Sequence, residues 1–456
     1  MKTVQSINPF DESVVASHEL MSDEVIAEVI EENHQTFQSW RKTRFSERRP
    51  LMMKAAEVLE ANQEQYATLM AREMGKPIKG GRAEVQKCAW ACRWYAENAE
   101  ALLADEPIQT EASRAYTHYA PIGTVLAVMP WNFPLWQVFR FAAPALMAGN
   151  GGILKHASNV FGSALVIEDV FREAGFPSSL FRTLLASASQ VATIIENPRV
   201  RAVTLTGSTP AGKAVASKAG EMLKKTVLEL GGSDPYVILD DADLDLAASV
   251  CASSRLINSG QSCIAAKRFI VTRKNHDAFL ERFVAEMKAR KMGDPLREDV
   301  DIGPQARIDL RDELHEQVRR TVEAGAELVL GGEVPPSKGA FYPATVLTGV
   351  EKGMAAYSEE LFGPVATVIR VEDESEAIDV ANDSVFGLGG AVFSRDLVRA
   401  ERIAAEEMDV GCCFVNDFVK SDPRLAFGGV KESGYGRELG AFGPREFMNI
   451  KTVSVR

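Results

Sequence analysis

Cysteine is scarce in this sequence, with six residues of that type among 456 and no Cys-x-x-Cys pair. Thiols so few and irregularly spaced do not build a disulfide framework, and we expect a reducing compartment, with the cytoplasm as the location. Cys88 and Cys92 lie four residues apart on one helical face, without a histidine or acidic partner on that stripe. They are expected to pack in a helix core, and no metal site is predicted.

Basic side chains are in deficit as well. The chain has 51 lysines and arginines against 63 aspartates and glutamates, a formal charge of -12. Binding to nucleic acid or to an anionic membrane needs a basic surface. The composition therefore predicts neither as a partner, whereas local cations can still bind a small anionic substrate.

An uninterrupted apolar run of membrane-spanning length is also missing. The longest apolar region, from Pro121 to Gly152, is broken by Pro130, Pro134, Pro144 and Arg140, so it does not predict a transmembrane helix. The N-terminal stretch MKTVQSINPFDESVV lacks the apolar core of a signal peptide. We expect no membrane insertion and no export.

The dinucleotide fingerprint Gly-x-Gly-x-x-Gly does not occur after any predicted strand. The segment from Gly207 to Lys213 imitates a phosphate-binding loop, but Ala214 replaces the hydroxyl residue that would hold magnesium, and Pro210 interrupts the loop. A nucleotide triphosphatase is therefore a disfavoured alternative. A strand that ends in Thr206, Gly207 and Ser208 before a helix can still hold a diphosphate on the free amides of that helix.

The composition is otherwise that of a globular protein with two or more domains, at 46% hydrophobic and 25% charged residues. Apolar residues recur at helical spacing from Ser22 to Asp105, and residues 109–119 alternate like an exposed hairpin arm. From Gly123 short β-rich runs alternate with amphipathic helices, which predicts an α/β fold with mostly parallel sheets. The runs of the first half are TVLAV, GGILK, SLFRTLL, AVTLT, TVLEL and YVILD, and a second half follows from about Asp241. The closing strand EFMNIKTVSVR has no obvious local partner.

The stretch NSGQSCIAAKR, from Asn258 to Arg268, contains the candidate nucleophile Cys263. A thiol becomes a strong nucleophile when neighbouring dipoles or cations increase its thiolate fraction. Gly260 permits a turn and a close approach of substrate to the backbone. Taken alone, Cys263 is as well explained as a small core hydrophobe.

Six strings occur in order across nearly the whole chain: MPWNFP, LTGS, LELGG, GQSC, EELFGPV and AFGGVKESGYGRE. Together they resemble the NAD(P)-dependent aldehyde dehydrogenase superfamily. The resemblance implies two Rossmann-like α/β domains and a small β oligomerisation arm, hence a homodimer or homotetramer. The cofactor-binding domain would comprise residues 1–105 and 120–231, the catalytic domain residues 232–430, and the arm residues 106–119 and 446–456.

By this resemblance Cys263 is the nucleophile, Glu229 the general base, and Asn132 a donor to the oxyanion. The thiolate would add to an aldehyde carbon, hydride would leave for the nicotinamide, and water activated by Glu229 would hydrolyse the resulting thioester. A catalytically inactive scaffold of the same fold is the remote alternative, and the intact Cys263, Glu229 and Asn132 argue against it.

The resemblance also implies a set of cofactor-binding residues. Lys155 matches the lysine at the adenosine ribose, Ser208 after Gly207 the diphosphate contact, Glu360 the nicotinamide-ribose contact, and Phe362 and Trp131 the surroundings of the nicotinamide. Relatives specific for NAD commonly have a glutamate three residues after that lysine, whereas this chain has Ser158. We therefore expect NAD or NADP as cofactor.

The expected substrate is a small aldehyde, and the best match is succinate semialdehyde. Arg140 and Ser421 occupy positions that are aromatic in relatives acting on apolar aldehydes, which resembles semialdehyde dehydrogenases whose substrate has a distal carboxylate. A second arginine of those enzymes is replaced by Ile257, although Arg255 lies nearby. A glutarate-semialdehyde, hydroxyaldehyde or broad-specificity enzyme remains the alternative, and Arg140 has a structural alternative, pairing with a local acid. Cys412 and Cys413 are expected to be buried and inert.

Overall fold

The computed structural model describes residues 2–456. A six-stranded sheet in the order β19-β9-β8-β5-β6-β7 forms the centre of the first half, and β19 alone runs antiparallel to its neighbour. Its strands are β5 (Thr124–Met129), β6 (Gly151–His156), β7 (Phe181–Thr183), β8 (Val200–Thr206), β9 (Lys225–Glu229) and β19 (Gly434–Tyr435).

Helices cover this sheet. They are α1 (Asp23–Trp40), α2 (Phe45–Ala61), α3 (Gln63–Met74), α4 (Ile78–Leu102), α5 (Trp136–Met147), α6 (Phe161–Glu173), α7 (Val191–Glu196) and α8 (Thr209–Glu221), with 3-10 turns η1 (Ser158–Val160) and η2 (Ala188–Gln190). The helical spacing from Ser22 to Asp105 thus becomes four helices, and Cys88 and Cys92 are buried in their core. An N-terminal hairpin, β1 (Thr3–Ile7) with β2 (Val14–Glu19), was not predicted.

The apolar region from Pro121 to Gly152 is apolar because it is interior. All residues of α5 are buried between the sheet and its covering helices. Apolar side chains are therefore favoured on every face of this helix. In the part of the chain that the structure describes, no helix has the length and apolar character that a membrane crossing requires.

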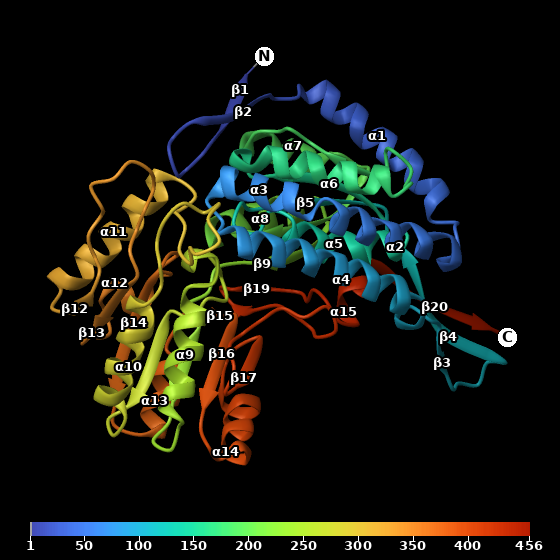
Figure 1. Cartoon of the computed structure of the whole chain (residues 1–456). Coiled ribbons are helices and arrows are strands. Elements are labelled where there is room, and N and C mark those ends of the chain that lie inside the picture. Colours follow the sequence, from blue (N-terminus) through green and yellow to red (C-terminus); the bar gives the residue numbers. More distant parts are fainter. Residues whose placement is uncertain (1) are drawn as a thin grey trace.

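A second sheet of seven strands has the order β12-β13-β14-β11-β10-β16-β17 (Figure 1). The run YVILD, predicted as the last strand of the first half, forms β10 at the centre of this second sheet, where it pairs in parallel with β11 and β16. The strands are β10 (Pro235–Ile238), β11 (Arg268–Thr272), β12 (Glu327–Leu330), β13 (Thr345–Thr348), β14 (Val365–Val371), β16 (Gly389–Phe393) and β17 (Cys412–Val415).

The helices of this half are α9 (Leu244–Arg255), α10 (His276–Lys288), α11 (Ile308–Glu323), α12 (Ala355–Ser358), α13 (Glu374–Asn382) and α14 (Leu397–Arg402), with the 3-10 turn η3 (Ile257–Gly260) and the π-turn η4 (Ile403–Glu407). The small strands β15 (Phe386–Gly387) and β18 (Val430–Lys431) pair with each other, and α15 (Phe442–Glu446) follows β19. Two largely parallel sheets with covering helices confirm the α/β fold class.

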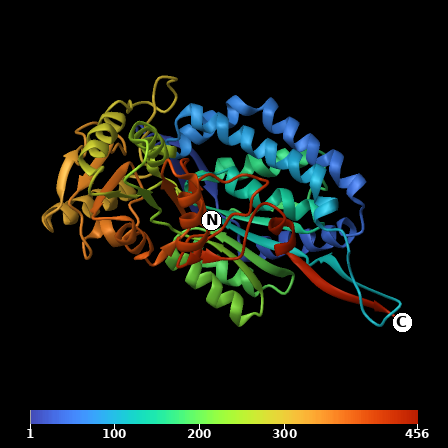
Figure 2. The ribbon, with the colours of Figure 1, turned by 90° about the horizontal axis from the view of Figure 1, so that it is seen from below.

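Three antiparallel strands, in the order β20-β4-β3, form an arm that projects from the body (Figures 1 and 2). The strands are β3 (Glu106–Ile108), β4 (Arg114–Pro121) and β20 (Met448–Val455). The closing strand, which has no local partner in the sequence, pairs with β4 over its whole length. Before it does so, the chain returns to the first sheet as β19, a passage that the sequence did not predict.

Candidate active site

Four parallel strands of the first sheet, β5, β6, β8 and β9, present their carboxyl ends at one edge. The residues after them are therefore neighbours in space although they are far apart in the sequence. Asn132 follows β5, Ser158 follows β6, Ser208 follows β8, and Glu229 is the last residue of β9. A bond from Gly207 N–H to Glu229 O, at 3.0 Å, fixes the relative position of the last two ends.

A cavity of about 240 Å³ lies at this edge. Cys263 lines it from the second half of the chain, and Asn132 lines it from the first. Most of the predicted cofactor-binding residues line the same cavity, namely Trp131, Gly207, Ser208, Glu360 and Phe362. The structure thus brings the candidate nucleophile, the candidate oxyanion donor and these residues to one site.

The segment before Cys263 has an unusual backbone. Asn258 and Ser259 have φ of 52° and 58°, and Gly260 has φ of 76°. A Cβ atom on Gly260 would lie 2.2 Å from the carbonyl carbon of Gly363. Gly260 is therefore required by the packing of two backbones, and not, as the sequence suggested, for the approach of a substrate.

Asn132 is held in one orientation. Its Oδ1 accepts a hydrogen bond from Gln137 Nε2 at 3.0 Å, and its Nδ2 donates to Gln261 O at 3.0 Å. Asn258 Nδ2 donates to Asn132 O at 2.7 Å. These bonds leave one N–H of the Asn132 amide without a protein acceptor, so it is available to an oxyanion formed next to Cys263.

Burial raises the pKa of the Cys263 thiol to about 12, and the nearby Lys267 opposes this shift. Lys267 Nζ donates to Cys263 O at 2.7 Å and to Ser262 O at 2.9 Å, and pairs with Glu360 at 3.2 Å. The lysine thereby connects the backbone of Cys263 to Glu360. A thiol with so high a pKa is neutral near pH 7 and needs a base to become nucleophilic.

Glu229 is the candidate for this base. Its side chain is 2% exposed, and neither carboxylate oxygen accepts a well-formed hydrogen bond from any residue in the range 2–456. Burial is the main cause that raises its pKa well above the usual range, opposed most strongly by the charge of Arg140. The absence of a side chain at Gly428 gives it room, because a Cβ there would lie 2.9 Å from Glu229 Oε1. A carboxyl of raised pKa is suited to taking a proton near neutral pH.

Arg140 does not lie where a substrate carboxylate would reach it. Its buried guanidinium forms an ion pair with Glu438, donates to Thr206 Oγ1 at 3.2 Å, and approaches Glu229 to 4.0 Å. It also covers the ring of Phe427. The predicted contact of Arg140 with substrate is therefore corrected in favour of the structural alternative. Arg140 pairs with an acid, because Glu438 already neutralises its charge.

Arg255 is similarly enclosed, with no exposed surface and a 2.6 Å bond from its Nη2 to Gly260 O. It supports the segment that leads to Cys263. It lines neither the cavity described above nor a second, neighbouring cavity. Ser421, in contrast, is next to a second cavity and is described below. Cys412 and Cys413 are half-buried rather than fully buried, and burial raises the pKa of both thiols.

Arg140 and Glu438 are expected to shift the pKa of Glu229 in opposite directions. In the double variant Arg140→Met/Glu438→Gln this pKa should rise, because Arg140 affects it more strongly than Glu438 does. In Glu438→Gln alone the pKa should fall. The pH dependence of thioester hydrolysis, measured by stopped flow, should move to higher pH in the first variant and to lower pH in the second. Shifts of the same sign in both variants would contradict this electrostatic arrangement.

The predicted adenosine-ribose contact, Lys155, lies at the end of β6 beside Val128 of β5. It is 9% exposed, and its ammonium forms no ion pair or hydrogen bond with another residue in the range 2–456, while burial lowers its pKa. An ammonium group without a protein partner fits a polar ligand. Ser158 is exposed in the turn that follows, and Ser208 begins α8 without its hydroxyl capping that helix. The amides at the start of α8 are thus free to bind a diphosphate.

Two cavity-wall residues, Glu360 and Phe362, are positioned by contacts. Glu360 accepts a hydrogen bond from Gly232 N–H at 3.1 Å, and Phe362 packs edge to face against Trp131 at 5.7 Å. Lys213, the lysine of the phosphate-loop imitation, points away and pairs with Glu432 at 2.9 Å. The nucleotide triphosphatase alternative therefore has no support from the geometry.

Several residues of the site were not predicted from the sequence. Glu438 has its partner Arg140 far away in the chain, which no local pattern reveals. Gln137 bonds Asn132 only five residues away, and Lys267 bonds the nearby Cys263 O as well as the distant Glu360. Glu84 belongs to the same group: its carboxylate accepts hydrogen bonds from the N–H groups of Leu135 and Trp136, both at 2.9 Å, and so holds the loop after Asn132. The sequence could have indicated Lys267. This lysine lies four residues after Cys263 and directly before an apolar strand, so its burial near the candidate nucleophile could be expected.

Comparison with known proteins agrees with this site. The family model described as "Aldehyde dehydrogenase family" matches residues 1–453. The succinate-semialdehyde dehydrogenase (NADP+) 1 of Mycobacterium tuberculosis is 49% identical over 453 residues, 99% of each chain. The succinate-semialdehyde dehydrogenase (NADP+) of Mycolicibacterium paratuberculosis is 50% identical over 454 residues, 99% of this chain and 96% of that one. The crystal structure of succinic semialdehyde dehydrogenase from Streptococcus pyogenes in complex with NADP+ matches with a TM-score of 0.97 and 39% identity, covering 99% of each chain.

The chain belongs to the aldehyde dehydrogenase family. The resemblance carried by the six strings is confirmed, and the fold matches that of solved members over its whole length.

Proposed function

We propose that this protein oxidises succinate semialdehyde to succinate with NADP+ as the preferred electron acceptor. The observation that carries the reaction type is that Cys263 and Asn132 line one cavity with Gly207, Ser208 and Glu360, at the strand ends where a dinucleotide would be held. The substrate and the cofactor are supported by relatives of that name at 49% and 50% identity over nearly the full chain.

Each step of the proposed reaction is assigned to residues of this chain. Glu229 takes the proton of the Cys263 thiol, and the thiolate sulfur forms a bond to the aldehyde carbon. The Asn132 amide and the Cys263 N–H donate to the resulting oxyanion, a contribution of about 10²- to 10³-fold for each donor. The bound nicotinamide supplies the chemistry of a hydride acceptor, which leaves a thioester on Cys263. Glu229 releases the first proton to solvent and then removes a proton from water, whose oxygen bonds to the thioester carbon. The C–S bond breaks, and the acid and the Cys263 thiolate are released.

The site fits a dinucleotide with a 2'-phosphate. Lys155 would bind the adenosine ribose, Ser208 and the start of α8 the diphosphate, and Glu360 the nicotinamide ribose. Ser158 places no negative charge next to Lys155, so nothing at this position repels the additional phosphate of NADP.

Ser158→Glu is expected to weaken NADP binding roughly tenfold or more relative to NAD, because a carboxylate would be brought near a doubly charged phosphate. Ser158→Gln is the matched control, with the same side-chain length and no charge, and should change the ratio little. Dissociation constants for both cofactors are measured by fluorescence titration. Equal losses for the two cofactors in Ser158→Glu would show that Ser158 does not face the ribose.

The activity itself is tested by NADPH or NADH formation with aldehydes of three to six carbons, each with and without a distal carboxylate. A preference for the four-carbon carboxylated aldehyde supports succinate semialdehyde. A maximum at five carbons favours glutarate semialdehyde, and equal rates for charged and uncharged aldehydes favour a broad-specificity enzyme.

Two further features of the proposal concern assembly and location. Ile108 and Ile450 are exposed on the arm β20-β4-β3, which projects from the body (Figure 2). These exposed apolar residues support the use of the arm as an interface between copies in a homodimer or homotetramer. The six free cysteines support a reducing compartment, the cytoplasm.

A further inference from the structure

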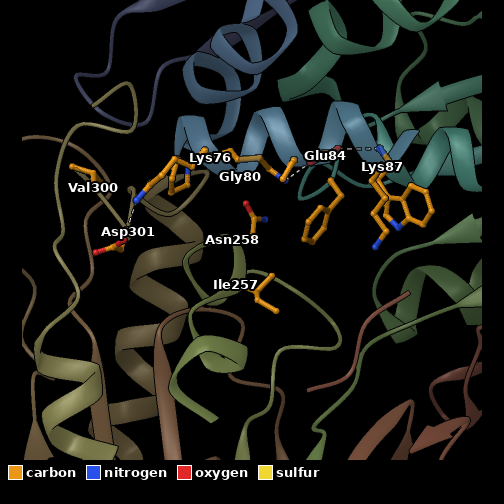
Figure 3. Close-up of a pocket in the computed structure, with 13 residues that line it drawn as sticks. Lys76, Gly80, Glu84, Lys87, Ile257, Asn258, Val300 and Asp301 are labelled. Atoms are coloured by element: carbon orange, nitrogen blue, oxygen red, sulfur yellow. Dashed lines mark hydrogen bonds and ion pairs between the residues drawn. The ribbon is translucent and has the colours of Figure 1, made fainter. Parts of the chain in front are cut away.

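A second cavity, of about 290 Å³, adjoins the segments that carry the candidate catalytic residues. It is lined by Phe133, next to Asn132, and by Ile257 and Asn258, which precede Cys263. The first cavity is lined by other residues of the same two segments. Figure 3 shows Glu84 and Lys87 on helix α4, with Asn258 and Ile257 on the other side of the space.

Three lysines line this cavity, and two of them are neutralised by the protein. Lys76 forms a buried ion pair with Glu84, and Lys79 pairs with Asp301 at 3.3 Å. Lys87 differs, because within residues 2–456 its ammonium forms no ion pair. It donates to Ser421 Oγ at 2.7 Å and lies 4.4 Å from the centroid of the Trp136 ring.

Ser421 is oriented so that its hydroxyl hydrogen is free. Its oxygen accepts hydrogen bonds from Lys87 Nζ at 2.7 Å and from Trp136 Nε1 at 3.1 Å, so both lone pairs are used. Its own O–H has no acceptor among the residues that the structure describes. Lys87 likewise retains two N–H donors without acceptors. Ser421 is bonded to two lining residues, Lys87 and Trp136, and is not itself a lining residue. Lys87 and the adjacent Ser421 together present several donors and a positive charge, which is what a carboxylate requires.

We propose that Lys87 and Ser421 bind the distal carboxylate of the substrate, in the role that the sequence suggested for Arg140 and Arg255. This inference rests on the proposed function and names its specificity-determining residue. Trp136 and Phe133 would contact the methylene groups between the carboxylate and the aldehyde.

The electrostatics of the cavity agree. Burial and the charge of Arg140 lower the pKa of Lys87 to about 8. An ammonium group in this state lacks a counter-ion, and a bound carboxylate would supply one. Arg140 and Arg255, the arginines suggested by the sequence, do not need a carboxylate from the substrate. Arg140 is already paired with Glu438, and Arg255 is enclosed and bonded to Gly260 O.

The test compares kcat/KM for succinate semialdehyde with that for butanal, which has the same number of carbons and no charge. Lys87→Met keeps the length of the side chain and removes the charge, and it should lower the ratio of the two values by about 10- to 150-fold. Lys87→Arg should restore much of the ratio, and Ser421→Ala should lower it by a smaller factor. Lys79→Met, which removes another lysine of the same cavity, should change it less than twofold.

Succinate binding, measured by calorimetry, separates this inference from the proposed function. Wild-type protein should bind succinate, and Lys87→Met should bind it at least tenfold more weakly. If wild-type protein prefers succinate semialdehyde and Lys87→Met keeps that preference, the role of Lys87 is wrong while the function stands. Equal losses for both aldehydes in Lys87→Met would also overturn it. Succinate binding that depends on Lys87, in a protein without activity on succinate semialdehyde, would support the carboxylate site and reject the proposed function.

Discussion

Replacing Cys263 by alanine is expected to lower kcat by roughly 10⁴-fold or more, because the covalent thiohemiacetal and thioester cannot form without the sulfur. Binding of NADP should be almost unchanged, since Lys155, Ser208 and Glu360 do not depend on the thiol. The measurements are steady-state NADPH formation and cofactor binding by fluorescence titration.

The matched control is Cys413→Ala, which removes another half-buried thiol from the second sheet. It should retain most of the activity. Substantial turnover by Cys263→Ala would reject the assignment of the nucleophile, and a parallel loss of cofactor binding would show that the variant had lost its fold.

Glu229→Gln is expected to separate the two halves of the reaction. Thioester hydrolysis should slow by about 10²- to 10⁴-fold, because the amide cannot take a proton from water. The first hydride transfer should slow as well, because Glu229 also activates the thiol, but hydrolysis should slow more, so that the acyl-enzyme accumulates after one hydride transfer. Rapid mixing should show a burst of at most one NADPH per subunit, and intact mass measurement should show a succinyl group attached at Cys263.

Two controls make this result specific. Cys263→Ala should give neither burst nor adduct, and Glu432→Gln, which changes a partly exposed carboxylate on the surface, should turn over normally. A Glu229→Gln enzyme with a slow first turnover and no trapped adduct would instead assign Glu229 mainly to the activation of the thiol, which the high pKa of Cys263 also requires.

The residues at the strand ends could be predicted from sequence because parallel strands impose their proximity. Asn132, Ser208 and Glu229 each end a short apolar run, and the carboxyl ends of such runs meet at one edge. The α/β class followed from the same alternation of runs and helices. The family strings then singled out Cys263 from six cysteines.

The charge pairing of the site could not be predicted in this way. Arg140 was interpreted from its position in the family pattern alone, and its partner Glu438 lies in a segment that reaches the first sheet only through β19. Lys87 lies on α4, and its contacts with Trp136 and Ser421 join three segments that are separate in the sequence. Side-chain pairing between distant segments needs the tertiary register, which the hydrophobic pattern does not contain.

The pairing of β19 with β9 has a consequence for the synthesis of the chain. Gly434 pairs with Glu229 and Tyr435 with Leu228, so the enclosure around the base is completed by residues translated near the end. Domains generally fold from the N-terminal side during translation. A nascent chain can therefore complete the five parallel strands of the first sheet while Glu229 is still at an open edge of that sheet. With Glu229 as the proposed general base, the chain would become able to hydrolyse the thioester only after the last segment docks.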